Sequence, residues 1–243
     1  MFYHRLAAYY DLIFPPEQNK TAFLHREFAA VGAKRILDLA CGTGTYAVEL
    51  ARLGYETWGT DLEPALIELA QIKAADDLPA ARFTVGDMRE PEVLGLMFDG
   101  LFCIGNSLAH LIEINDLKVA LAAMRRVLNS PGRAVLQIVN FDRILALGET
   151  ELPLIEREGL TFARIYRPCG EERLQFDSVL AVNGAGKSAG RFENSVTLRP
   201  IRRAELERLL LEAGFTGVRV YGDFKYGEFN EANSQATVVV AEC

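Results

Sequence analysis

Short apolar runs alternate with amphipathic stretches through the first 140 residues of the chain. A short apolar run bounded by turn residues is typical of a buried strand, whereas apolar residues spaced three and four apart indicate a helix. The pattern predicts strands over residues 35–41, 56–60, 82–85, 100–104 and 134–139. Helices are predicted over residues 46–53, 64–74 and 116–128. Such alternation predicts a parallel sheet with helices on both faces.

The pattern changes after about Asn140. Three segments then alternate in polarity with no helical period between them, over residues 160–167, 173–182 and 191–198. The Gly-rich stretch at residues 183–186 is typical of a turn between strands. We therefore expect an antiparallel β layer inserted into the main sheet.

The last part of the chain returns to the first pattern. It predicts a helix over residues 203–213 and strands over residues 217–221 and 236–241. These late strands complete a sheet of seven, so we expect an α/β fold with a doubly wound, mostly parallel sheet and an inserted antiparallel layer. Residues 1–145 and 200–243 would form the core, and residues 146–199 a lid on the substrate side.

Composition narrows the class of protein without identifying a function. Lys and Arg number 26 and Asp and Glu number 33, which gives a formal net charge of −7. This acidic balance disfavours nucleic acid or an anionic membrane as the main partner, and no apolar run reaches the roughly 18 residues of a transmembrane helix. The four cysteines are far apart and the N-terminus lacks the apolar core of a signal peptide, so we expect a cytoplasmic protein. No Cys/His cluster has zinc-ligand spacing, so we expect no metal site.

The most informative stretch is residues 36–45, ILDLACGTGT, in which a buried strand runs into a glycine turn and then a helix. Glycines permit a sharp turn and let a ligand approach the main chain closely. Gly42 and Gly44, with Ala47 three residues later, fit the loose G-x-G-x-x-G/A dinucleotide fingerprint. The glycines alone are also compatible with a tight strand-to-helix turn that binds nothing.

Three carboxylates at successive strands favour a ligand. Asp38 lies within an apolar strand, where an ionised group is costly without hydrogen-bond partners, and we expect amides of the adjoining loop to supply them. Asp61 closes the second strand, where a carboxylate can accept hydrogen bonds from both ribose hydroxyls. Asp87 ends the third strand, where it can accept from an exocyclic amine while Met88 packs on a purine face. Together these positions predict a nucleoside pocket.

Residues 38–44, DLACGTG, resemble the first motif of class I S-adenosylmethionine-dependent methyltransferases. Asp61 and residues 86–88, GDM, match the second and third acidic positions of that family. Three further stretches resemble glycine N-methyltransferases and related small-amine methyltransferases: residues 103–111 (CIGNSLAHL), 140–145 (NFDRIL) and 222–225 (GDFK). Those enzymes also carry strands inserted before the last part of a Rossmann-like sheet, as expected here.

The resemblance implies methyl transfer from S-adenosylmethionine to a small molecule, with S-adenosylhomocysteine as the product. An amine nitrogen, glycine/sarcosine-like or amino-sugar-like, is the favoured acceptor. The implied cofactor residues are Asp38, Ala40, Cys41, Gly42, Gly44, Asp61, Leu62, Asp87, Met88, Ile104 and Asn106. The implied catalytic and substrate residues are Asn106, Ser107 and His110, with Tyr9 or Tyr10 over the cofactor and Arg164 or Arg167 on the substrate.

Other classes of protein fit less well. The dinucleotide fingerprint of nicotinamide oxidoreductases has no aspartate at the place of Asp38, and a second, separate catalytic domain is not evident. Residues 105–109, GNSLA, approach the nucleophile elbow of serine hydrolases, but no histidine follows His110 to complete the order Ser, Asp or Glu, His. O-methylation of a small hydroxyl compound and a non-enzymatic S-adenosylmethionine-binding module stay open as alternatives.

Overall fold

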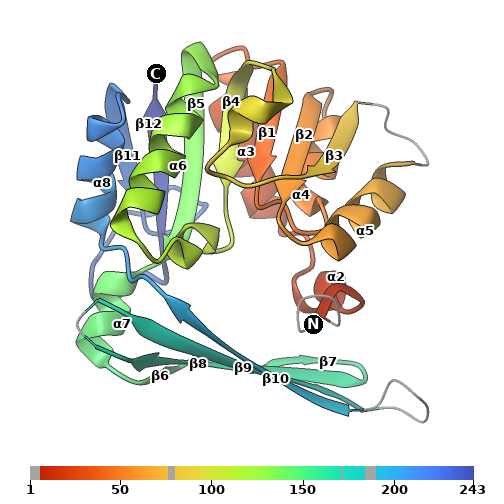
Figure 1. The fold of residues 1–243 in the computed structure, drawn as a ribbon, viewed down its shortest axis with the longest axis vertical. Coiled ribbons are helices and arrows are strands. Elements are labelled where there is room, and N and C mark those ends of the chain that lie inside the picture. The colour runs from red at the N-terminus through yellow and green to blue at the C-terminus, as the bar shows by residue number, and fades with distance from the viewer. Residues whose placement is uncertain (1–5, 76–79, 171, 184–189) are drawn as a thin grey trace.

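The computed structural model describes residues 6–75, 80–170, 172–183 and 190–243. Figure 1 shows two layers: a seven-stranded sheet with its helices above, and an antiparallel sheet below. None of the helices in these ranges is both long and apolar enough to cross a membrane.

The seven-stranded sheet has the order β11-β12-β5-β4-β1-β2-β3. Its strands are β1 (Arg35–Leu39), β2 (Glu56–Asp61), β3 (Ala81–Val85), β4 (Phe98–Cys103), β5 (Leu128–Val139), β11 (Gly217–Tyr221) and β12 (Ala236–Glu242). Strands β1 to β5 are mutually parallel, whereas β12 is antiparallel to both β5 and β11. The chain runs outward from β1 to β3 and then crosses back to β4. The topological switch point therefore lies between β1 and β4, where ligands of such sheets bind at the carboxyl ends of the strands.

Helices cover both faces of this sheet. They are α3 (Gln18–Ala29), α4 (Thr45–Arg52), α5 (Pro64–Ala75), α6 (Ile114–Arg126) and α8 (Arg203–Glu212). Two further helices, α2 (Tyr10–Ile13) and α7 (Phe141–Leu147), lie toward the antiparallel layer, and the short 3-10 helices are η1 (Pro91–Leu94) and η2 (Ser107–His110). Successive side chains of a strand point to opposite faces. Accordingly, Ile36 packs in the cluster that contains Phe28 of α3, and Leu37 packs in the cluster that contains Leu117 of α6.

The lower layer is antiparallel. Its strands are β6 (Thr150–Glu151), β7 (Ile155–Arg157), β8 (Leu160–Pro168), β9 (Leu174–Val182) and β10 (Gly190–Leu198), in the order β10-β9-β8-β6 with β7 also paired to β8. The three long strands are those that the sequence predicted, and the short strands β6 and β7 were not predicted. The expected α/β fold with an inserted antiparallel layer is thus confirmed. Of the expected turn at residues 183–186, residues 184–186 lie outside the described part of the chain.

One boundary differs from the sequence prediction. The sequence predicted a strand over residues 134–139, but β5 begins at Leu128 and runs through residues 130–132. Between the pairs Phe98–Leu128 and Gly100–Arg133, the longer stretch of β5 bulges away from β4. The side chain of Asn129 donates to a carboxylate oxygen of Asp99 on β4 (2.8 Å), which keeps the bulged segment on the sheet.

Candidate active site

The glycine loop joins the carboxyl end of β1 to α4. Its backbone enters the left-handed region three times, at Ala40 (φ 56°), Gly42 (φ 58°) and Gly44 (φ 70°). A left-handed alanine is strained, and such strain is commonly kept at ligand sites. Cys41, between them, donates its amide to the carbonyl of Thr60 at the end of β2 (3.0 Å). The loop is therefore anchored beside the strand that carries Asp61.

Asp38 and Asp61 lie at the switch-point end of the sheet but in different surroundings. Asp61 accepts the amides of Gly42 (2.9 Å) and Glu63 (3.0 Å), so the loop amide serves Asp61 rather than Asp38, contrary to our expectation. The Asp38 side chain is 3% exposed and has no hydrogen-bond partner among the described residues. Burial, reinforced by the neighbouring Asp61 charge, holds the pKa of Asp38 well above its ordinary value. Burial also raises the pKa of Asp61, although its two amide donors oppose the shift.

The adenine end of the proposed pocket differs from the sequence interpretation in one respect. Asp87 follows β3 as predicted, but its carboxylate is bound by the Arg89 guanidinium, with N–O distances of 2.6 to 3.1 Å, and this contact lowers its pKa. Met88 is 8% exposed and packs within the main core. Leu62, after Asp61, is 65% exposed. Of these side chains, Leu62 presents the most open apolar surface to a ligand.

The structure distinguishes the two N-terminal tyrosines. The phenol of Tyr10 lies over the glycine loop, because a Cβ added to Gly42 would stand 3.0 Å from its hydroxyl oxygen. Burial, then the charges of Asp61 and Asp38, raise the pKa of Tyr10. Tyr9, like Tyr10, packs at the margin of the apolar cluster between α2 and the antiparallel sheet. Tyr10 is therefore the tyrosine that the structure brings to the predicted cofactor residues.

The acceptor-side residues follow β4. Ile104 is 9% exposed, and Asn106 has a left-handed backbone (φ 73°) just before η2. The Asn106 side chain does not cap η2; its oxygen accepts the amide of Val139 at the end of β5 (3.0 Å). The Asn106 amide nitrogen has no partner among the described residues and is left to donate to a ligand, and the oxygen keeps one further lone pair.

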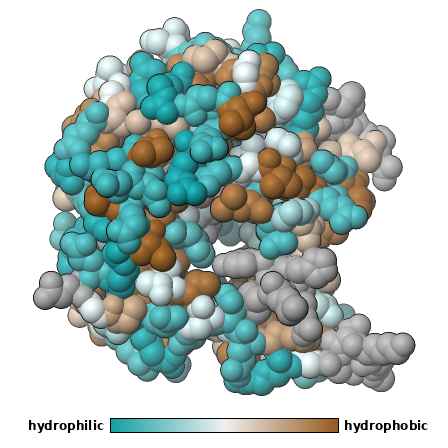
Figure 2. Space-filling view, in the orientation of Figure 1, coloured by the Kyte–Doolittle hydropathy of each residue, from teal (hydrophilic) through white to brown (hydrophobic). Residues whose placement is uncertain are grey.

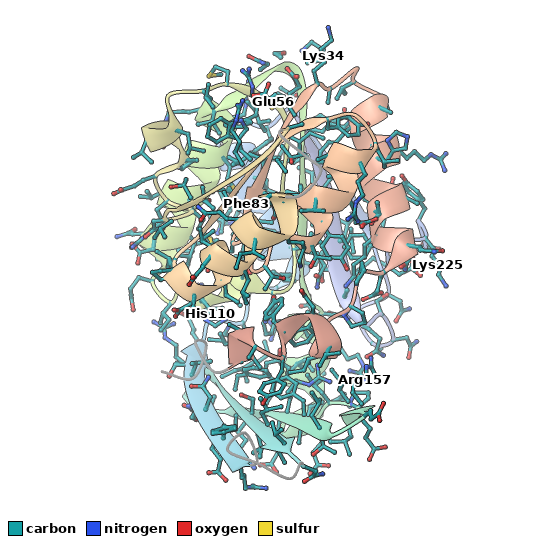
Figure 3. All side chains as sticks on the ribbon, turned by 90° about the vertical axis from the view of Figure 1, so that its right-hand side faces the viewer. Lys34, Glu56, Phe83, His110, Arg157 and Lys225 are labelled. Atoms are coloured by element: carbon teal, nitrogen blue, oxygen red, sulfur yellow. The ribbon has the colours of Figure 1, made fainter. Side chains whose placement is uncertain are left out.

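Ser107 and His110 are the first and last residues of η2. Figure 3 shows His110 at the lower edge of the upper layer, close to the antiparallel sheet, whereas Lys34 and Glu56 lie at the opposite end. The His110 imidazole keeps access to solvent, yet the surrounding protein desolvates it and lowers its pKa, while the Asp61 charge opposes this shift. Asp61 at the end of β2 and the residues after β4 both lie at the carboxyl ends of the parallel strands, the edge of the sheet that faces the antiparallel layer. Figure 2 shows the surface hollowed between the two layers.

Arg164 and Arg167 lie on opposite faces of β8. Arg164 shares its face with Phe162 and Tyr166, which are 3% and 2% exposed and face the core. Its guanidinium donates to the carbonyl of Pro153 (2.7 Å), and its Nε is buried with no partner among the described residues. Arg167 is exposed on the outer face, where it pairs with Asp177 and Glu149. The structure therefore brings Arg164 toward the crevice and leaves Arg167 outside it.

Sequence reasoning missed a polar network beside the glycine loop. Asp11 and Lys73 meet the hydroxyls of Thr43 and Thr45, although they come from parts of the chain 62 residues apart. The pair Tyr10-Asp11 next to a predicted cofactor tyrosine was a signal for Asp11. Lys73 gave no signal, because a lysine on a helix is ordinarily a solvated residue.

Comparisons with known proteins agree with this geometry. A family model described as a methyltransferase domain matches residues 36–132. The glycine/sarcosine N-methyltransferase of Aphanothece halophytica is 28% identical over 199 residues, which cover 80% of this chain and 71% of that protein. The dTDP-3-amino-3,4,6-trideoxy-alpha-D-glucopyranose N,N-dimethyltransferase of Streptomyces venezuelae is 27% identical over 183 residues, 75% of each chain. The solved structure of an S-adenosylmethionine-dependent methyltransferase from Clostridium acetobutylicum shares the fold, with a TM-score of 0.82, 18% identity and coverage of 99% of this chain and 98% of that one.

The sheet is doubly wound and its glycine loop lies at the switch point. Together with the matched domain, this arrangement is typical of α/β enzymes that bind a nucleoside-containing cofactor there. The methyltransferase-domain match over residues 36–132 and the relatives named as N-methyltransferases support a class I S-adenosylmethionine-dependent methyltransferase, with S-adenosylmethionine as its cofactor. The family predicted from the motifs is thus confirmed.

The polar groups of the site match the chemical groups of this cofactor. Asp38 is a buried carboxyl with no partner among the described residues, which suits a cationic group. Each oxygen of Asp61 accepts one amide and so retains a further lone pair, which suits hydroxyl donors. Gly42 has no side chain between the loop backbone and the Tyr10 ring, so the backbone there can be approached closely, whereas Gly44 packs against Phe83 and Ala70. We take Asp38, the glycine loop and Asp61 as the proposed cofactor site.

Proposed function

We propose that this enzyme methylates the nitrogen of a small amine. The observation that carries the proposal is the uncharged polar group beyond β4, formed by Asn106, Ser107 and His110 at the same edge of the sheet as Asp61. A macromolecular acceptor would call for a broad basic surface, whereas the net charge is −7. The relatives that carry names for glycine, sarcosine and amino-sugar substrates all act on amines, which favours nitrogen over oxygen.

The cofactor supplies an electrophilic sulfonium methyl group when it is bound. Asp38, the glycine loop and Asp61 would hold the cofactor, whose methyl group would pass from sulfur to the amine nitrogen while that nitrogen would give up a proton. The chain must hold the amine neutral and in line, and exclude water. Because desolvation lowers the pKa of His110, its imidazole is neutral near pH 7 and can accept that proton directly or through water. The Asn106 amide nitrogen would orient an oxygen of the acceptor.

A second polar feature suggests that the acceptor carries an anionic group. On the inner face of the antiparallel sheet, Arg164 is in register with Ser178 of β9, which is in register with Asn194 of β10. The Ser178 hydroxyl is buried and, like the Arg164 Nε, has no partner in the described structure. Unsatisfied buried donors are costly, so a ligand that accepts from both would be bound strongly. We propose that residues 146–199 roof the acceptor side and that Arg164 holds a carboxylate or another anionic group.

The test is a methyl-transfer screen that measures S-adenosylhomocysteine release. The acceptors are glycine, sarcosine, amino sugars and a matched set of small hydroxyl compounds. We expect turnover with an amine, and Arg164→Met to raise KM for a carboxylate-bearing amine by about tenfold to a hundredfold, as for loss of a charge-assisted pair. Arg167→Met is the matched control, since it removes the same charge from the outer face of the same strand. Turnover with hydroxyl compounds alone would overturn the proposal, and equal effects of the two arginine variants would remove Arg164 from the site.

A further inference from the structure

A short N-terminal segment lies between the two layers of the molecule. We call residues 6–14 the clasp; they contain α2 and precede the Pro15-Pro16 break before α3. Figure 1 shows α2 between the carboxyl ends of the parallel strands above and the antiparallel sheet below. The clasp therefore contacts the part of the enzyme that holds the cofactor and the part proposed to cover the acceptor.

The upper contact is polar and centres on Asp11. Its carboxylate accepts the hydroxyl of Thr43 in the glycine loop (2.6 Å) and pairs with the ammonium of Lys73 on α5 (2.9 Å). Lys73 also donates to Thr43 (3.0 Å) and to Thr45 (2.9 Å), the first residue of α4. Thr43 is 1% exposed, so the network reaches from solvent to the buried side of the loop. Asp11 thus connects the clasp to the end of the glycine loop that leads into α4.

The lower contact is largely apolar. Leu6 and Ile13 are buried against Leu160, Phe162 and Leu180 of the antiparallel sheet. Phe14 meets the ring of Phe162 edge to face, with ring centroids 5.9 Å apart. Arg157 of β7 donates to the carbonyl of Leu12 (3.1 Å). Figure 3 shows Arg157 on the antiparallel sheet close to α2. This side of the clasp is held by burial rather than by charge.

The two contacts fix the position of Tyr10. Its ring lies 3.0 to 3.3 Å from the place where a Gly42 side chain would begin, and it also stacks obliquely on Phe14 (centroids 5.2 Å apart). Tyr10 therefore covers the loop surface proposed to hold the methionine half of the cofactor. Asp11 is the next residue, so its hydrogen bonds to the loop fix the position and orientation of the Tyr10 ring relative to the glycine loop.

We propose that Asp11 is a positioning residue that controls cofactor retention by holding the clasp, and with it Tyr10, on the glycine loop. The inference rests on the proposed placement of the cofactor at that loop, but not on the identity of the acceptor. Opening the clasp from the loop breaks the Asp11 network while the apolar contact with the antiparallel sheet persists. The rate of this opening limits the rate at which S-adenosylhomocysteine leaves.

The ionic character of the network gives the proposal a distinctive signature. The side chains of Asp11 and Lys73 are 48% and 26% exposed, so their attraction is screened by salt. Raising the salt concentration to 1 M shortens the Debye length to about 3 Å. We therefore expect salt to speed product dissociation from the parent enzyme, and to do so much less when Asp11 carries no charge.

The experiment uses the full chain with Asp11→Asn, Lys73→Met and the double variant. Dissociation of S-adenosylhomocysteine is measured by stopped-flow displacement at low and high salt, and thermal melting is measured in parallel. We expect Asp11→Asn to speed dissociation by about fivefold to twentyfold, in keeping with loss of charge-assisted bonds, and the double variant to equal the single one. Glu49→Gln is the matched control, because Glu49 forms a comparable surface pair with Arg52 on α4 without contact to the clasp.

Several outcomes would overturn the proposal. Unchanged dissociation in Asp11→Asn, or the same change in Glu49→Gln, would show that the network does not control retention. A lower melting temperature with unchanged dissociation and unchanged salt dependence would make Asp11 structural only. Because no acceptor is present in this assay, its result is independent of whether the enzyme methylates nitrogen or oxygen.

Discussion

Gly44 occupies the tightest point of the glycine loop, and its replacement tests how the loop is built. Its φ of +70° lies in the left-handed region, where a side chain costs about 1–2 kcal/mol. A Cβ there would lie 2.5 Å from two ring atoms of Phe83 and 3.0 Å from the Cβ of Ala70. Such overpacking adds about 1–3 kcal/mol. We therefore expect Gly44→Ala to lower the free energy of unfolding by about 2–5 kcal/mol in total.

Gly95 offers a control that separates strain from crowding. Its φ is +64°, but nothing lies within 4 Å of the position of its Cβ. Gly95→Ala should therefore cost only the backbone strain of about 1–2 kcal/mol. In a Gly44→Ala background, Phe83→Leu withdraws the ring that crowds the new methyl group. We expect this double variant to be more stable than the two single losses predict, by about 1–3 kcal/mol.

The assay is urea denaturation of the ligand-free protein, with the free energy of unfolding obtained by linear extrapolation. Two results would refute the reasoning. One is a loss in Gly44→Ala that does not exceed the loss in Gly95→Ala. The other is strict additivity between Gly44→Ala and Phe83→Leu, which would mean that the ring does not restrict the loop.

Two further variants address the site carboxylate and amide. Asn106→Asp keeps an oxygen for the Val139 amide but removes the amide nitrogen, so we expect stability within about 1 kcal/mol of the parent and a large loss of turnover with cofactor binding kept. Parental turnover in that variant would make Asn106 purely structural. The pKa of Asp38 is raised by burial, so its contribution to stability is present below its unfolded pKa of about 4 and is lost as pH rises through the folded value. We expect Asp38→Asn to flatten the pH dependence of the melting temperature over that window, and parallel curves for variant and parent would contradict this.

Much of the fold was predictable because its signals are local. The strand β1 and the glycine turn after it follow from a single ten-residue stretch, and the three long strands of the insertion follow from alternation without helical spacing. The bulge at residues 129–132 was not predictable from local signals. A Ser-Pro-Gly sequence indicates a turn by itself, and the Asp99 side chain that keeps it on the sheet comes from another strand.

The site was partly predictable for the same reason. The two arginines of β8 are three residues apart, so they must point to opposite faces of the strand. Our sequence interpretation left the choice between them open, although the alternation of Phe162 and Tyr166 with Arg164 was a signal that this arginine faces inward. By contrast, the choice between Tyr9 and Tyr10 depends on how α2 is anchored to Thr43 and Lys73, which are distant in sequence.

Asp87, Asp61 and Asp38 differ in how well the protein itself stabilises a negative charge on the carboxylate. Asp87 is already neutralised by Arg89 and its pKa is lowered. Asp61 has two amide donors but still a raised pKa, and Asp38 has neither a cation nor a hydrogen bond among the described residues. A positive charge on the ligand would therefore stabilise Asp38 most, Asp61 less and Asp87 least. A cofactor with an uncharged purine at one end, hydroxyls in the middle and a cationic methionine half at the other matches this order in one orientation only. Reversing it would place the cation beside Arg89 and leave Asp38 without compensation, so the proposed cofactor site predicts a methyl group directed toward Asn106 and the antiparallel sheet.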